Sequence, residues 1–318
     1  MKASFDDCFQ TFPSIQSPPD LNRFWQKGMT ALKRVNVDPR SRLVLSRSLG
    51  RESLSEVNFA GLDNHRLHGL FTVPRRRGKL PAVIAFHDYH EQIDGSGHIS
   101  GEGLALLTVQ LRGHETEFFS HSAGSDLELR EKQLCADAGL ADAEASYLYR
   151  AYLDAVRCVD FLRLQKSIDM QRIGIIGRGF GAALAVFAAT QMSENVRALV
   201  LERPSFLWLQ SWLEESTSDL AQEIKHLVSR NTRLYTRSKK NLPLFDPLNW
   251  TEQLKPEVMA AVSLEDDWNP PRPAFGFFNR LKAEKSMQLS PDEESYPTAS
   301  EQRARSLKFM AEILAEAE

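Results

Sequence analysis

The chain has 318 residues, of which 25% are charged, and a formal net charge of −3 at pH 7. This length is enough to bury a substantial core, in one large α/β domain or in two smaller ones. The acidic balance argues against nucleic-acid binding as the main task, because such binding normally needs a concentrated basic face.

Cysteine content and the amino terminus bear on the compartment. The cysteines are odd in number and widely spaced, so they give neither a disulfide framework nor zinc-site spacing, and a reducing compartment is expected. They are Cys8, Cys135 and Cys158. The first residues carry acids and prolines where a signal peptide needs a continuous apolar stretch, and no window approaches transmembrane length. We therefore expect a cytoplasmic protein that does not act at a membrane.

The first predicted elements lie within residues 1–80. A proline-marked amphipathic helix is predicted over 17–35, and we expect it to pack across the sheet. Its large apolar side chains near one face are Leu21, Phe24, Trp25 and Leu32. Strand-like runs separated by turn residues then predict an antiparallel meander at one sheet edge. These runs are 42–49, 54–62 and 65–74.

From residue 82 the strand-like runs become apolar throughout, and helical patterns separate them. The runs are 82–88, 104–113, 172–177, 197–204 and 257–266. Strands that are apolar on both faces and alternate with helices indicate a parallel sheet covered on both sides. The sequence therefore predicts a doubly wound α/β fold. Nothing marks a second domain, so we expect a single domain over residues 1–318.

Residues 205–250 form an insert much longer than an ordinary connection. The segment is helical in pattern and rich in aromatic residues, and inserts of this kind often cap an active site. Trp208, Trp212 and Trp250 could stack on a sugar ring or form the core of the insert. We favour the core, because aromatic anchors dominate small apolar clusters.

Residues 172–189, RIGIIGRGFGAALAVFAA, combine a short apolar strand, a glycine-rich turn and a helix of small residues. This pattern is typical of a nucleophile elbow, in which hydrolases hold a catalytic serine on a strained corner. Where the G-x-S-x-G pattern has its serine, this chain has Gly179. Either the nucleophile lies elsewhere or the fold no longer hydrolyses its substrate.

Motifs spread along most of the chain resemble one known family. They include Phe24-Trp25, AFHDY at 85–89, VQLRGH at 109–114, FDPLN at 245–249 and SLEDDWNPP at 263–271. In their order and spacing they resemble the acetyl xylan esterase and cephalosporin C deacetylase type of α/β-hydrolase. The resemblance implies a serine hydrolase that removes acetyl groups from small sugars and related esters, often as a ring-shaped homohexamer.

The resemblance also assigns the three positions of a catalytic triad. The nucleophile position falls on Gly179, the acid falls on Asp266, which is retained, and the base position falls on Ser295. Independently of the family, this fold orders its triad as serine, acid and histidine, and the last histidine of the chain is His226. Serine and base are therefore both missing. Loss of either residue from such a triad costs on the order of a million-fold in turnover.

An oxyanion hole is the part of the machinery that the sequence can retain. The resemblance places its donors at the backbone N–H groups of Phe180 and Tyr89. Backbone donors survive side-chain changes, so a pocket for a carbonyl or an anion can persist. Two departures weigh against this pocket: Phe180 is bulky, and the glycine that the family has before the tyrosine is Asp88 here.

Other polar clusters have simpler explanations. One candidate metal cluster consists of His87, His90, Asp94 and His98. Its spacing matches no known set of ligands, and His87 fits a structural histidine of the family, so we expect no metal site. We also expect no cofactor. The basic runs at 74–81 and 236–240 are more often solvated turns than contacts with an acidic partner.

A displaced nucleophile is the main alternative to an inactive protein. Ser205 follows a strand end, and Ser120 and Ser122 flank His121, but no spacing pairs any of them with a base and an acid. Cys158 lies on a helix that we expect to be core.

The sequence thus predicts a catalytically inactive homologue that acts as a scaffold, or that binds a small acylated or sugar-like ligand. The alternative is an active carboxylic ester hydrolase. Its serine would come from 205–250 or 114–125, and its histidine from 87–98 or 114–121. A third class, an interaction subunit, would expose a large apolar patch.

Overall fold

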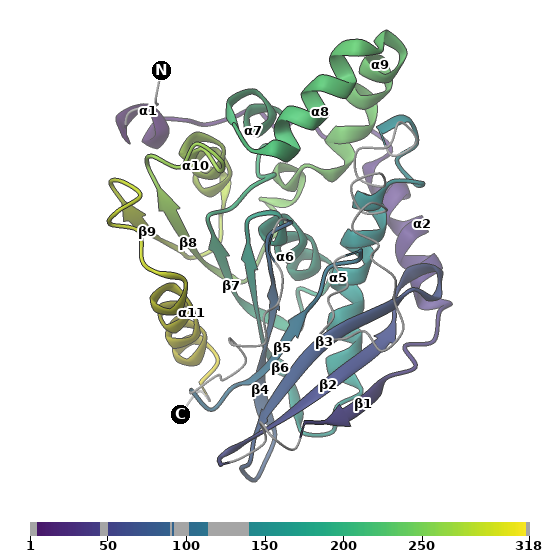
Figure 1. The fold of residues 1–318 in the computed structure, drawn as a ribbon, viewed down its shortest axis with the longest axis vertical. Coiled ribbons are helices and arrows are strands. Elements are labelled where there is room, and N and C mark those ends of the chain that lie inside the picture. Colours follow the sequence, from purple (N-terminus) through teal and green to yellow (C-terminus); the bar gives the residue numbers. More distant parts are fainter. Residues whose placement is uncertain (1–4, 45–49, 90, 92–101, 114–139, 316–318) are drawn as a thin grey trace.

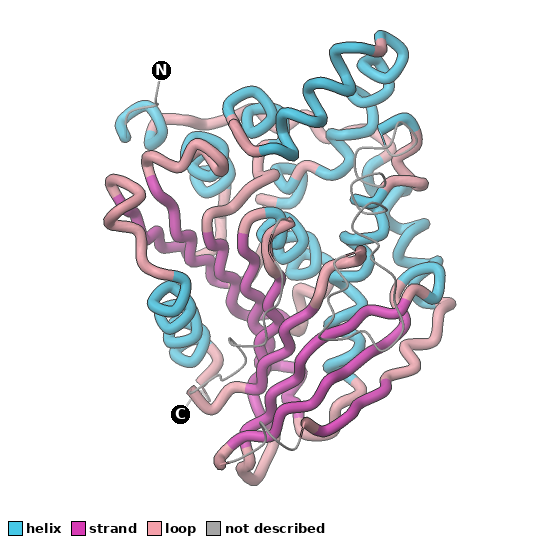
Figure 2. The backbone as a smooth tube through the Cα atoms, in the orientation of Figure 1, coloured by secondary structure: helices cyan, strands magenta, loops and turns pink. Residues whose placement is uncertain are grey.

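A computed structural model describes residues 5–44, 50–89, 91, 102–113 and 140–315 of the chain. Within these residues, nine strands form one sheet in the order β1-β2-β3-β5-β4-β6-β7-β8-β9. Figure 1 shows this twisted sheet with helices on both of its faces, and Figure 2 separates the helical and extended segments by colour.

The amino-terminal edge of the sheet is antiparallel. It consists of β1 (Arg40–Leu43), β2 (Glu52–Ala60) and β3 (Arg66–Pro74), and β3 continues antiparallel onto β5 (Ala105–Val109). The predicted meander is confirmed for the second and third runs. The first strand begins earlier than predicted, and residues 45–49 of that run lie outside the described residues.

The rest of the sheet is parallel, from β5 through to β9. Its strands are β4 (Leu80–Phe86), β6 (Ile168–Arg178), β7 (Val196–Glu202), β8 (Glu257–Ser263) and β9 (Lys285–Ser290). Every residue of β4 is buried, as expected for a central strand covered on both faces. The α/β-hydrolase fold is therefore present, and the loops that follow these strands gather at one edge of the sheet.

Alternate residues of the strands supply the two sides of the core. Ala82 and Ile84 face the helices α5 (Tyr147–Arg163) and α6 (Phe180–Gln191). Val83 belongs to a second cluster, beneath α11 (Ala299–Ile313). The period of two in these contacts is what a pleated strand requires.

The amino-terminal helix α2 (Leu21–Lys33) lies against α5. Trp25 stacks on Tyr149 and Tyr152 of α5, and its indole N–H donates to the carbonyl of Leu244 at 3.0 Å. Our expectation that this helix packs across the sheet was wrong, because α5 presents the aromatic surface that receives it. A short helix, α1 (Phe5–Phe9), packs on α10 (Pro271–Arg280).

The long insert is helical, as predicted. It contains α7 (Leu209–Glu215), α8 (Asp219–Arg230), α9 (Thr232–Asn241) and the 3₁₀ helices η3 (Leu242–Phe245) and η4 (Pro247–Trp250). These elements lie beyond the carboxyl ends of β6, β7 and β8, at the top of Figure 1. Trp212 and Trp250 are buried, which confirms the core interpretation for them, whereas Trp208 is partly exposed.

Two of the cysteines are buried free thiols. Cys8 packs in a small cluster with α10, and Cys158 lies in the main core on α5. Burial raises the pKa of both, that of Cys8 to about 11. Cys135 lies outside the described residues. In the part of the chain that the structure describes, no helix is both long and apolar enough to cross a membrane.

Candidate active site at the elbow

The sharp turn of the elbow is present even though its serine is not. Strand β6 passes into helix α6 through Gly179, whose backbone has φ 53° and ψ −122°. Glycine adopts such a conformation without steric cost. Two residues later Gly181 lets the helix approach the end of β4, since a Cβ there would lie 2.6 Å from the carbonyl oxygen of Phe86.

The side chain of Asp88 fills the space that a nucleophile at position 179 would need. Asp88 lies just after β4, beside the elbow. A Cβ built on Gly179 would overlap the carboxyl carbon and both carboxylate oxygens of Asp88. Any side chain at position 179 would therefore have to displace this carboxylate.

The same carboxylate engages the two backbone donors assigned to the oxyanion hole. The N–H of Phe180 donates to Asp88 Oδ1 at 2.8 Å, and the N–H of Tyr89 donates to the same oxygen at 2.7 Å. Phe180 is the first residue of α6, and the positive end of a helix dipole favours a negative charge there. One oxygen of the chain's own carboxylate thus lies where such donors would hold the oxyanion of a substrate.

Hydrogen bonds within its own loop, and contacts of that loop with β6 and with the loop after β5, hold Asp88 in place. Its backbone N–H donates to Glu91 Oε2 at 3.2 Å, and Glu91 in turn pairs with Arg178 Nε at 2.7 Å. His87 Nε2 accepts from the N–H of Leu111 at 3.0 Å, so its Nδ1 carries the proton and donates to the carbonyl of Asp88 at 2.6 Å. Both ring nitrogens of His87 are therefore engaged with backbone groups.

The acid position holds an ion pair in place of an acid–histidine pair. Asp266 is 6% exposed, and its Oδ2 accepts from Arg203 Nη1 at 2.8 Å. Its Oδ1 accepts from the backbone N–H groups of Trp268 and Asn269 at 3.0 and 2.8 Å. Burial raises the pKa of Asp266, and the neighbouring guanidinium acts in the opposite direction.

The base position lies in an exposed turn after β9. The N–H of Ser295 donates to Asp292 Oδ1 at 2.7 Å, and its hydroxyl donates to the carbonyl of the same residue at 3.1 Å. Its neighbours reach Arg203 instead: Glu293 pairs with the guanidinium at 2.7 Å, and the ring of Tyr296 lies 3.8 Å from it. The loop that carries the base position therefore contacts Arg203 through the carboxylate of Glu293 and the ring of Tyr296.

Arg203 is a site residue that the sequence analysis did not identify. It follows β7 directly and has a positive φ of 41°. The preceding residue, Glu202, accepts the N–H of Gly179 through its carbonyl at 3.0 Å. Its one signal in the sequence is its place near the end of the predicted strand over 197–204, where polar residues of such a sheet reach the site edge.

The displaced-nucleophile alternative takes its serine from 205–250 or 114–125 and its histidine from 87–98 or 114–121. Ser205 lies beside the elbow, since its N–H donates to the carbonyl of Gly179 at 3.1 Å, and it is 3% exposed. Five further serines of the insert are described: Ser211, Ser216, Ser218, Ser229 and Ser238. The serines and histidines of this alternative that lie outside the described part of the chain are Ser120, Ser122, Ser125, His90, His98, His114 and His121.

The described residues contain no group of three or more His, Cys, Asp or Glu side chains that could hold a metal ion. Of the four residues weighed as a metal cluster, only His87 is described. His90, Asp94 and His98 lie outside the described part of the chain.

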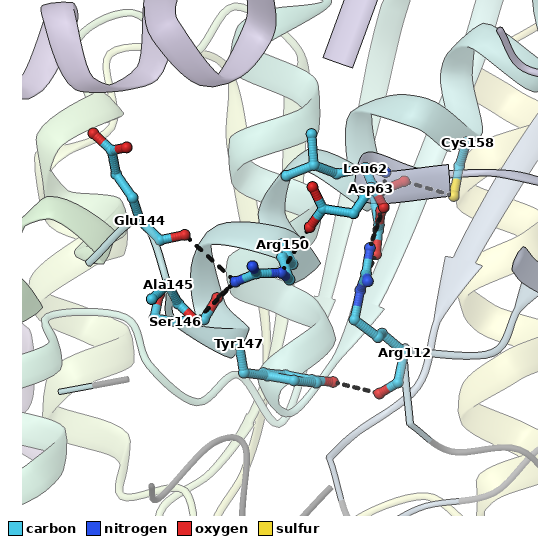
Figure 3. Close-up of polar contacts among 10 residues, drawn as sticks. Leu62, Asp63, Arg112, Glu144, Ala145, Ser146, Tyr147, Arg150 and Cys158 are labelled. Atoms are coloured by element: carbon cyan, nitrogen blue, oxygen red, sulfur yellow. Dashed lines mark hydrogen bonds and ion pairs between the residues drawn. The ribbon is translucent and has the colours of Figure 1, made fainter. Parts of the chain in front are cut away.

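A buried ion pair positions the loop after β5 (Figure 3). Arg112 donates through Nε and Nη2 to the two carboxylate oxygens of Asp154, at 2.8 and 3.0 Å. Asp154 also accepts the N–H of Leu62 at 3.1 Å, and Tyr147 donates its hydroxyl to the carbonyl of Arg112 at 3.1 Å. These contacts join the end of β5 and the loop after β2 to α5, and they give this arginine a structural role.

Comparison with known proteins places these observations in a family. The acetyl xylan esterase family matches the chain over residues 5–313. An acetyl esterase of Xylanibacter ruminicola is 20% identical over 299 residues, which cover 90% of this chain and 65% of that protein. The chain therefore spans somewhat less than two thirds of this relative's length.

Solved structures share the fold at low sequence identity. An acetyl xylan esterase from a Paenibacillus species superposes with a TM-score of 0.84 at 21% identity, over 98% of this chain and 99% of that one. One from a Thermoanaerobacterium species gives 0.80 at 20% identity, with the same coverage of 98% and 99%. An acylaminoacyl peptidase of Pyrococcus horikoshii gives 0.59 at 20% identity, over 86% of this chain and 44% of that one.

Proposed function

Because the chain belongs to the acetyl xylan esterase family, we propose that it is a member that does not hydrolyse esters and acts as a ligand-binding or scaffold protein. The observation that carries this proposal is the position of the Asp88 carboxylate. It takes the space of a side chain at Gly179 and accepts the N–H groups of Phe180 and Tyr89.

Acyl transfer on this fold needs a nucleophile, a base and donors for the oxyanion. Gly179 supplies no nucleophile, and the turn that contains Ser295 supplies no imidazole. The carboxylate of Asp88 would also repel the negative charge that develops on a reacting carbonyl. Three independent requirements of the reaction are therefore unmet at this edge of the sheet.

The proposal is tested by following hydrolysis of a chromogenic acetate ester by the purified full chain. A serine-reactive fluorophosphonate is applied in parallel as a labelling probe. We expect a rate equal to that of buffer and no labelled residue, because the elbow offers no nucleophile.

Ser205→Ala is the informative control, since Ser205 is the described serine bonded to the backbone of the elbow. A wild-type rate above buffer that this variant, or Ser120→Ala, abolishes would establish a displaced nucleophile. The protein would then be an active ester hydrolase, and the proposal would be wrong.

A further inference from the structure

A groove of about 810 Å³ lies in the insert, between residues 13–16 and the helices α7, α8 and α9. Its volume lies within the range of about 300–1,000 Å³ that is typical of small-molecule sites. Neither Gly179 nor Asp266 lines it, so it is separate from the degenerate elbow. We call it the lid groove.

One wall of the lid groove is apolar. Leu209 and Ile224 are almost completely buried, and Val228 and Leu242 remain partly exposed. These side chains come from α7, α8 and η3, so the apolar surface extends across three elements. Such a wall fits an extended alkyl body better than a compact polar one.

The rim of the groove is positively charged. Lys225, Lys239 and Arg272 line it beside the carboxylate of Glu214, and residues 225–240 contain six lysine and arginine side chains and no acid. Because the whole chain has a net charge of −3, the residues outside 225–240 carry a net charge of −9. A concentrated positive region on an otherwise acidic protein attracts anions.

The two lysines differ in how they are held. Lys225 donates to the carbonyl of Ser216 at 3.1 Å, at the end of α7. Lys239 lies 4.3 Å from the ring of Tyr235, and among the described residues it forms no ion pair. Lys239 is therefore the cation that remains available to a bound anion.

The carboxylate of Asp246 also lines the groove but faces the protein backbone. Its Oδ2 accepts from the N–H of Leu209 at 2.9 Å, and its Oδ1 accepts from the N–H of Leu248 at 3.0 Å. Burial raises the pKa of Asp246 to about 7, so its negative charge is partly neutralised near neutral pH. Asp246 therefore cancels less of the positive charge at the rim than an exposed, fully ionised carboxylate would.

The one tryptophan in the groove does not offer a free aromatic face. A Cβ on Gly276 would lie 2.7 Å from Cε3 of Trp208, so the ring packs directly on α10. The guanidinium of Arg272 lies 5.3 Å from the ring centroid. Tyr235, the other aromatic ring that lines the groove, has Lys239 Nζ over it at 4.3 Å. Stacking on a sugar ring needs an open face, so these two contacts favour an acyl chain over a carbohydrate.

We propose that the lid groove binds an amphiphilic monocarboxylate, such as a medium-chain fatty-acid anion. The alkyl chain lies along Ile224, Val228 and Leu242, and the carboxylate pairs with Lys239. This site goes beyond the proposed function by naming a ligand class, and it holds whether or not the elbow is active.

The test measures binding of hexanoate, octanoate and decanoate to the full chain by calorimetry, below their micellar concentrations. Burial of each additional methylene is expected to raise the affinity about fourfold. Methyl decanoate has the same chain without the charge, and we expect it to bind several-fold more weakly than decanoate. Equal affinities across the chain lengths would contradict insertion of the alkyl chain.

Two matched lysine variants separate the groove from general attraction by the basic helices. Lys239→Ala removes a lysine that lines the groove, whereas Lys240→Ala removes its exposed neighbour, which does not. We expect the first to weaken decanoate binding about three- to fivefold, and the second to leave it unchanged. Equal losses in both would overturn the proposal in favour of nonspecific electrostatic attraction.

A third variant tests the apolar wall directly. Val228→Phe narrows the groove and should weaken binding of decanoate more than that of hexanoate, with the fold checked by circular dichroism. If this variant does not fold, the paired lysine variants and the series of chain lengths still test whether the groove binds the fatty-acid anion. Binding of acetylated xylo-oligosaccharide in the groove without any binding of decanoate would also overturn the proposal.

Discussion

Asp88 and Gly179 depend on each other at the level of single atoms. The carboxylate fits beside the elbow only because position 179 has no side chain. The carboxylate in turn supplies acceptors to two backbone N–H groups that would otherwise point into the site. The two backbone N–H groups of an oxyanion hole are therefore present, and the carboxylate of Asp88 is bound to both of them.

Removing this anion should cost stability and create an anion site. Hydrogen bonds to a charged acceptor are worth about 1.5–3 kcal/mol, so Asp88→Ala should lower the free energy of unfolding by about that amount. Acetate should then stabilise the variant, because it can occupy the two vacated N–H groups, and it should leave the wild type unchanged. Urea titrations with acetate, and with chloride as the control, measure both effects; an equal response of the two proteins to acetate would contradict this account.

Arg203 should matter more to stability than its neighbour Arg178. Removing one member of a buried pair costs about 3–5 kcal/mol, and the side chain of Asp266 is only 6% exposed, so Arg203→Met should destabilise by about 3 kcal/mol at pH 7. The pair of Arg178 with Glu91 is more exposed, so Arg178→Met should cost about 1 kcal/mol or less. Urea unfolding of the two variants makes the comparison, and equal losses would contradict it.

The pH dependence of the Arg203 variant follows from the direction of the Asp266 shift. Burial raises the pKa of Asp266, and loss of the guanidinium would raise it further. The folded variant would then bind the proton more tightly than the unfolded chain, so its stability falls as pH rises through that raised pKa. Arg203→Met should therefore lose less stability near pH 4.5 than at pH 7, and the reverse order would show that Asp266 is not the residue left unpaired.

Among the secondary-structure elements, those defined by local pattern could be predicted from the sequence. Strand β6, the glycine turn and α6 were predicted because an apolar run and small residues define them locally. The position of α2 was not, because it depends on the aromatic residues that α5 presents to Trp25. The same limit applies to the site: Gly179, Asp266 and Ser295 follow from chain order, whereas the contacts of Asp88 and Arg203 join residues 92 and 63 positions apart.

The insert depends on Asp246, which joins α7 to η4. Burial raises the pKa of Asp246 to about 7, so the folded state holds its proton more tightly than the unfolded state does. The stability that this residue contributes is therefore present at low pH and falls as pH rises through about 7. Asp246→Asn cannot titrate and should flatten this part of the dependence between pH 5 and 8 in chemical unfolding. Glu214→Gln, on the same insert, should leave it unchanged.

Across the whole molecule, one edge of the sheet gathers loops from distant parts of the chain. The loops after β4, β6, β7, β8 and β9 carry Asp88, Gly179, Arg203, Asp266 and Ser295. The strands that place these loops are retained along the whole chain, so the fold alone does not determine the chemistry at this edge. The side chains that replace a triad have formed two new contacts, one at the elbow and one at Asp266.

These two contacts predict the order in which catalysis could be restored. Gly179→Ser with Ser295→His should remain inactive, because Asp88 still overlaps the new side chain and holds both oxyanion donors. Adding Asp88→Gly should allow a fluorophosphonate to label the introduced serine and give weak hydrolysis of a chromogenic acetate. Turnover should remain on the order of ten-thousand-fold below that of an intact triad, because Arg203 still holds the carboxylate that would orient the new imidazole.

Replacing Arg203 by Ala in that background should raise the rate, and Asp266→Asn should abolish the gain. Equal activity with and without Asp88 would show that its carboxylate does not block the site.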